Sequence, residues 1–173
     1  MAQPLYRQYL RQARRLASLD PRRPQQGNLR RAVSTAYYAL FHFLVDQSSR
    51  FLVGSTNHRE ALRRVAARAF QHGEMADAAK SFRSGTLPPP VTRIAGVVSV
   101  SSQLRDVTRV FVLAQEQRPL ADCDLAETFL RSDVTALIGR IEKVIENWDG
   151  IRSDPATRLF LLGLLTWNRV RGR

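Results

Sequence analysis

The residues best suited to chemistry lie between positions 115 and 125, where the sequence reads QEQRPLADCDL. Arg118 stands four residues before Asp122. A guanidinium can hold a phosphate by paired hydrogen bonds, and a carboxylate can accept a proton. Arg118 stabilises the charged form of a carboxylate beside it, and a stabilised carboxylate is a weak base. The plainer interpretation is a structural polar cluster or helix cap formed by Arg118, Asp122 and Asp124.

His42 is the histidine whose surroundings matter most. It ends the string AYYALFH, on a stretch that is otherwise apolar and has helical spacing. A core histidine satisfied by a hydrogen bond is the plainer interpretation. The alternative is a role as an acid–base group, because imidazole titrates near neutral pH. That role requires Arg31 or Arg118 nearby in space. The candidate catalytic residues are therefore Arg118, Asp122 and His42.

The other histidines and the cysteine predict no metal site. His58 precedes an arginine-rich segment and suits a cap, whereas His72-Gly73 suits a helix C-terminus, where the dipole favours a cation. The histidine spacing gives no zinc signature, and Cys123 has no second cysteine to pair with. The common phosphate-loop, dinucleotide, serine-hydrolase and zinc-protease motifs are absent from the sequence. We expect no metal and no cofactor.

Positive charge is the strongest signal in the composition. The chain has a net charge of +12, and only two of its 27 basic residues are lysines. Residues 121–149 hold seven acids against three bases, a net of −4, so the remainder carries +16. Such an excess attracts polyanions, RNA among them. The candidate phosphate-binding and base-stacking residues are Arg30, Arg31, Arg59, Arg63, Tyr37 and Tyr38, although core packing is the plainer interpretation of the two tyrosines.

Length and hydropathy bound the class of protein. A chain of 173 residues suits one domain, residues 1–173, which can bury a core without a metal or disulfide. The first residues lack the apolar core of a signal peptide, and the most apolar segment, 159–167, is too short to span a bilayer. With a single cysteine, these features predict a cytoplasmic protein with no membrane segment.

Helical periodicity runs through most of the chain and predicts an all-α bundle of five to seven helices. The expected helices cover 4–19, 28 to about 50, 58–72, 74–83, 101–118, a segment that Ser132 caps, and a last segment that begins at Asp154-Pro155. Asn28 is the expected N-cap of the second helix. No strand run is convincing, and residues 97–101 come nearest to one.

Prolines predict interruptions of the helical structure at two places. PPP at 88–90 cannot sit inside a helix, so residues 84–96 are expected to be irregular. Pro119 disfavours the α region for Arg118, so the helix should kink or stop there.

Two apolar features predict a homodimer. The segment 155–170 is apolar nearly all round, so it must be covered. Small residues recur at helical spacing in the second helix, where they would let a neighbouring backbone approach: Ala32, Ala36 and Ala39. Burial in the core of the same chain is the default, and burial against a second copy is the alternative.

The strings at 28–44 and 115–125 together resemble a known family. NLRRAVSTAYYALFHFL resembles the second helix of HEPN-like (higher eukaryotes and prokaryotes nucleotide-binding) bacterial proteins, and QEQRPLADCDL resembles the segment in which an arginine precedes an Ala-Asp-aromatic-Asp run. In the RNA-cleaving branch of that family, a histidine follows this arginine by about four to six residues. Here no histidine follows Arg118, Pro119 comes directly after it, and Cys123 stands where an aromatic residue or histidine is usual. The catalytic motif is therefore degenerate.

The resemblance implies an RNA- or nucleotide-phosphate-binding protein of a toxin–antitoxin or phage-defence system. An antitoxin or another defence component is the protein partner that it implies. One alternative is an active, metal-independent endoribonuclease toxin that uses Arg118. The other is a purely structural helical module that binds another protein.

Overall fold

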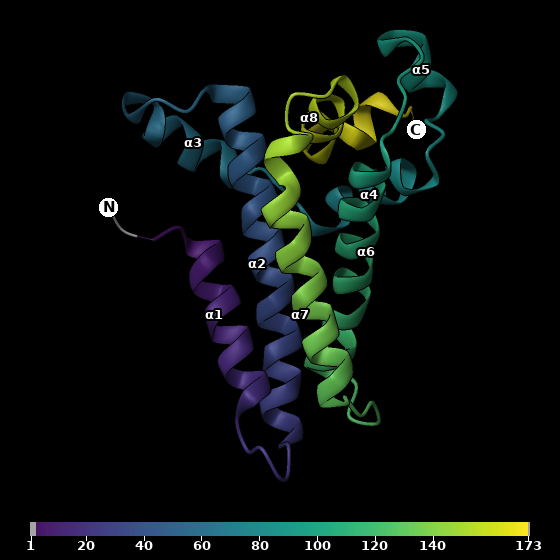
Figure 1. Cartoon of the computed structure of the whole chain (residues 1–173). Coiled ribbons are helices and arrows are strands. Elements are labelled where there is room, and N and C mark those ends of the chain that lie inside the picture. The colour runs from purple at the N-terminus through teal and green to yellow at the C-terminus, as the bar shows by residue number, and fades with distance from the viewer. Residues whose placement is uncertain (1–2, 173) are drawn as a thin grey trace. The chain divides into compact units, whose positions relative to one another are not determined.

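The computed structural model describes residues 3–172, and all regular structure in this range is helical (Figure 1). The elements are α1 (Leu5–Ser18), α2 (Gln26–Val53), η1 (Asn57–Arg59), α3 (Glu60–Ala67), α4 (His72–Ser84), α5 (Pro89–Ala95), α6 (Ser102–Cys123), α7 (Arg131–Glu146), η2 (Asn147–Gly150) and α8 (Pro155–Val170). The predicted all-α class is confirmed for these residues. In the same range, none of the helices combines the length and apolar character needed to cross a membrane.

The chain forms two compact units, each built from two separate stretches of sequence. Unit 1 comprises residues 3–43 and 110–146, and so contains α1, α7 and parts of α2 and α6. Unit 2 comprises residues 44–109 and 147–172, and contains α3, α4, α5, α8 and the remaining parts of α2 and α6. A single domain over 1–173 stays a prediction.

Unit 1 is centred on the first part of α2. Its apolar side chains at helical spacing, among them Leu29, Val33 and Leu40, are at most 1% exposed. α1 packs against α7 and turns its small residues Ala13 and Ala17 inward. An ion pair between Arg14 and Glu142 joins these two helices at the surface.

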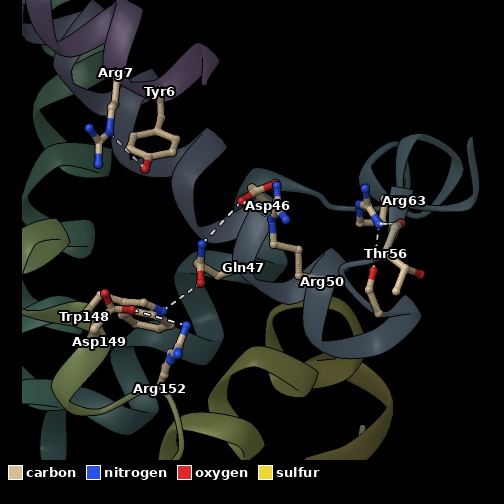
Figure 2. Close-up of polar contacts among 11 residues, drawn as sticks. Tyr6, Arg7, Asp46, Gln47, Arg50, Thr56, Arg63, Trp148, Asp149 and Arg152 are labelled. Carbon is tan, nitrogen blue, oxygen red and sulfur yellow. Dashed lines mark hydrogen bonds and ion pairs between the residues drawn. The ribbon is translucent and has the colours of Figure 1, made fainter. Parts of the chain in front are cut away.

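Unit 2 is centred on the packing of α4 against α8. The Phe82 ring lies 5.3 Å from that of Phe160 and 5.5 Å from that of Trp167, measured between ring centroids. In the same unit, Trp148 Nε1 donates to Gln47 Oε1 at 2.9 Å (Figure 2). Gln47 Nε2 donates in turn to Asp46, whose carboxylate pairs with Arg50.

The prediction that the helix would kink or stop at Arg118 was wrong about the stop, because α6 continues through Pro119 to Cys123. A proline inside a helix removes one backbone hydrogen bond. The guanidinium of Arg30 holds the part of the helix beyond Pro119 by donating to the carbonyls of Leu120 and Ala121, which belong to its last turn. The continuation matters for the site, because it keeps Arg118 and Asp122 on one helical face.

Several expected boundaries also shifted. α2 begins at Gln26 rather than after an Asn28 cap, and α7 begins at Arg131, so Ser132 lies within it. The expected helix over 58–72 is broken, and His72 begins α4 instead of ending a helix. Residues 84–96 are not wholly irregular, because α5 starts at Pro89, where prolines are tolerated in the first turn. This short helix makes eight α-helices in the described part of the chain, one more than predicted.

The two apolar features that suggested a homodimer are buried within the chain itself. Ala32, Ala36 and Ala39 have no exposed surface. On α8, Phe160 and Trp167 are at most 1% exposed, and Leu162 is the exposed large apolar residue of this helix. The homodimer stays a prediction, but neither feature needs a second copy to cover it.

Candidate functional site

A cluster of polar and aromatic side chains surrounds Arg118 in unit 1. We call it the Arg118 cluster, and it consists of Tyr9, Ser34, Tyr37, Tyr38, His42, Arg118 and Asp122. It draws on α1, α2 and α6, which the chain brings together from positions more than 100 residues apart. Five of the nine predicted site residues therefore belong to one cluster: Tyr37, Tyr38, His42, Arg118 and Asp122.

The ion pair at the base of the cluster follows from the helix. Arg118 and Asp122 are four residues apart on α6, and Arg118 Nε donates to Asp122 Oδ2 at 3.2 Å. The same carboxylate oxygen accepts from the hydroxyl of Ser34 at 3.4 Å. The side chains of the pair are 32% and 27% exposed, so the pair remains open to solvent. Asp122 therefore acts first as the group that holds Arg118 in place.

Two tyrosine rings of α2 flank the guanidinium. The Arg118 Cζ atom lies 5.7 Å from the ring centroid of Tyr37 and 5.6 Å from that of Tyr38, within the range of cation–π attraction. Burial lowers the pKa of Arg118, but the hydrogen bond to Asp122 and the neighbouring tyrosines outweigh this, so the net shift is upward and Arg118 stays cationic. Burial raises the pKa of Tyr37, and the charge of Arg118 opposes this increase only in part.

The two tyrosines differ in what they can reach. Tyr37 is fully buried, so its ring cannot stack on a nucleobase, and its predicted role in base stacking loses support. Tyr38 is half-buried, and its ring lies between Arg118 and His42 in the chain of contacts. Of the two residues, Tyr38 is therefore the one that can meet a ligand.

His42 joins the cluster through aromatic contacts. Its ring stacks on Tyr9 at a centroid distance of 5.4 Å and an angle of 15°, and lies 6.3 Å from the ring of Tyr38. Burial lowers the pKa of His42, so the imidazole is neutral at neutral pH. Both Arg118 and His42 thus contact Tyr38.

Arg30, a predicted phosphate ligand, is occupied by the protein backbone. Its Nη1 donates to the carbonyls of Leu120 at 3.3 Å and Ala121 at 3.1 Å. Its Nη2 donates to the carbonyls of Asp124 at 2.7 Å and Glu127 at 2.6 Å. These four bonds satisfy the end of α6 and the loop after it, so Arg30 has a structural role and its predicted role as a phosphate ligand loses support.

Two further candidates in unit 2 have a similar structural use. Arg59 donates to the carbonyl of Val53 at 2.6 Å. Arg63 donates to the carbonyls of Gly54 and Thr56, both at 2.8 Å (Figure 2 shows Arg63 and Thr56). Arg31 differs, because its side chain is exposed and donates to no other described residue.

A separate hollow of about 360 Å³ lies in unit 1 and contains no predicted site residue. Its lining mixes apolar side chains such as Phe129 with the charged groups of Glu127, Asp133 and Arg140. In the described part of the chain, no group of histidine, cysteine and carboxylate side chains is arranged to hold a metal ion.

Sequence reasoning missed two members of the cluster. The sequence singles out neither Tyr9 nor Ser34 as a site residue. Neither has a sequence signal of its own, because each acquires its role from a contact between helices, Tyr9 with His42 and Ser34 with Asp122.

The Arg118 cluster can hold an anion beside an aromatic surface, which is the chemistry of a phosphate next to a base or sugar. It offers a fixed cation, a half-buried tyrosine and a neutral imidazole. No family model, no curated protein and no solved structure matches this chain, so the cluster must be interpreted from its own geometry.

Proposed function

We propose that the chain is a HEPN-like protein that binds RNA or nucleotide phosphate at the Arg118 cluster, with catalysis weak or absent. The observation that carries the proposal is the placement of one partly exposed guanidinium by a carboxylate and two tyrosine rings. Its place in a toxin–antitoxin or phage-defence system is part of the same proposal and rests on the resemblance alone.

The physical argument begins with the donors of Arg118. A guanidinium has five N–H donors, and a phosphate takes two of them in parallel. The ion pair with Asp122 engages Nε and fixes the orientation of the group. Fixing the donor before binding reduces the entropy lost on binding, which favours affinity. The net positive charge of +12 attracts a polyanion to the protein.

Weak catalysis follows from the protonation chemistry available. Asp122 already accepts hydrogen bonds from Arg118 and Ser34, so it is poorly suited to take a proton from a ribose hydroxyl. In the family that the chain resembles, the catalytic histidine follows the arginine on the same helix. Here His42 comes from α2 and contacts Tyr38. A well-placed acid–base group contributes about 10²–10⁴ in rate, so its loss should leave little cleavage.

The test is the affinity for a short fluorescent RNA at low and at high salt. Binding should weaken steeply with salt because each neutralised phosphate releases counterions. Arg118→Ala should weaken binding by about tenfold, the size expected for one charge-assisted contact. Arg109→Ala is the matched control, because Arg109 is an exposed arginine of the same helix and its loss changes the net charge equally.

The outcomes separate the proposals. Equal losses in the two variants would mean that only net charge matters, which contradicts a site at Arg118. No binding of the wild type at low salt would leave the structural interaction module as the better account. Arg118→Lys adds a check, because lysine keeps the charge but lacks the planar fork, and its affinity should fall between those of alanine and arginine.

A second candidate is a metal-independent ribonuclease that uses His42 in place of the absent histidine. The observation that favours it is the shared contact of Arg118 and His42 with Tyr38, together with a neutral imidazole that can accept a proton. Purified protein incubated with total RNA in a chelator tests it. Cleavage by the wild type that disappears in both Arg118→Ala and His42→Ala would replace the binding proposal with this one.

A further inference from the structure

The loop between α6 and α7 presents an apolar side chain to solvent from a fixed backbone. Leu125 is 96% exposed. The backbone on both sides of it is held, because Arg30 donates to the carbonyls of Asp124 and Glu127, and Asp124 Oδ1 accepts from the backbone N–H of Ala126 at 2.9 Å. Two acids of the loop flank this position in sequence: Asp124 and Glu127. We call residues 124–127 the acidic loop.

A second exposed apolar surface lies on α3 and has the opposite charge. Leu62 is 59% exposed and Val65 is 70% exposed, and their spacing of three residues puts them on one face of the helix. None of the residues of α3 is buried. Arg64 and Arg68 border these positions, and Arg64 pairs with Glu60 of the same helix. We call this surface the α3 face.

We propose that the acidic loop of one copy docks on the α3 face of a second copy. Leu125 would cover Leu62 and Val65, and the carboxylates would lie beside Arg64 and Arg68. Scattered exposed leucines are ordinary, but here two ordered apolar positions carry flanking charges of opposite sign. A nucleic acid would match the arginines of α3 and would leave Leu62 and Val65 uncovered, so a protein partner fits better. The contact is independent of the RNA proposal.

Disulfide trapping tests the contact directly. In a Cys123→Ser background, one variant carries Val65→Cys and a second, tagged variant carries Leu125→Cys. Each chain then has a single cysteine, so no bond can form within a chain. Mild oxidation of the mixture should give a linked pair containing one chain of each kind. Linked pairs that form equally well in either variant alone, or no linked pair in the mixture, would overturn the proposal.

Association in solution gives an independent measurement. Light scattering on nuclease-treated protein should show an average mass that rises with protein concentration and falls at high salt. Leu125→Ser should weaken association by about tenfold, as expected for the loss of one central anchor. Val97→Ser is the matched control, because Val97 is 97% exposed and lies outside both surfaces, so it should associate like the wild type. Equal behaviour of the two variants, or a constant monomer mass, would contradict the proposal, and neither outcome touches RNA binding.

Discussion

Arg30 and Arg118 lie in the same unit and look alike in sequence, yet they are used in opposite ways. Arg30 donates to four backbone carbonyls of the α6 end and the loop that follows. Arg118 pairs with one carboxylate and lies beside two tyrosine rings. The first arginine holds the backbone, whereas the second is held by side chains and remains partly open to solvent.

The comparison teaches that positive charge alone does not identify a phosphate-binding arginine. Arg63 and Arg131 behave like Arg30, since each donates to backbone carbonyls: Arg63 to those of Gly54 and Thr56, and Arg131 to those of Leu19, Asp20 and Pro21. A guanidinium with its donors on carbonyls is not available to a ligand. The acceptors that an arginine already has within the protein therefore decide whether it can bind a ligand.

The largest effect that this comparison predicts is the loss of stability when Arg30 is replaced. Arg30→Ala should lower the free energy of unfolding by about 3 kcal/mol, because it removes charge-assisted bonds to four backbone carbonyls. Urea unfolding followed by circular dichroism measures it. Arg31→Ala is the control, since the neighbouring side chain is exposed and its loss should change stability by less than about 0.5 kcal/mol. Equal effects in the two variants would remove the structural role of Arg30.

A smaller effect on stability is expected at Arg118. The pair with Asp122 is about one third exposed, so Arg118→Ala should cost at most about 1 kcal/mol. The same urea titration measures it. A loss as large as that of Arg30→Ala would mean that Arg118 is a structural residue too, and the contrast between the two arginines would fail.

The smallest effect concerns pH and His42. Its folded pKa lies below the unfolded value of about 6.5, because burial disfavours the charged imidazole. As the pH falls through about 6.5, the unfolded chain takes up a proton that the folded protein does not, so the free energy of unfolding decreases. His42→Phe should flatten this part of the pH profile, because it removes the group that takes up the proton. An unchanged slope in His42→Phe would contradict burial of His42.

Much of the fold could be predicted because helical periodicity is a local signal. The start of α8 at Asp154-Pro155 appears where the sequence places it. The predictions failed where a contact with a residue far away in sequence, or the tolerance of proline in the first turn of a helix, decides the local structure. α6 passes through Pro119 while Arg30 satisfies the carbonyls beyond it, and α5 begins inside a run of prolines.

The site could be predicted only in part, for a related reason. Arg118 and Asp122 share a helix, so their spacing indicates a contact, and the structure has it. The acceptors of Arg30, the stacking of Tyr9 on His42 and the burial of Tyr37 depend on how separate helices meet. No pattern within one segment contains that information.

Arginine side-chain NMR during a titration with a short RNA tests the central claim most directly. The Nε–Hε signals report each guanidinium separately, so Arg30 and Arg118 are compared in one sample. We predict that the signal of Arg118 shifts as RNA is added at low salt, while that of Arg30 stays in place because its donors remain on carbonyls. A shift at Arg30 with none at Arg118 would contradict the account.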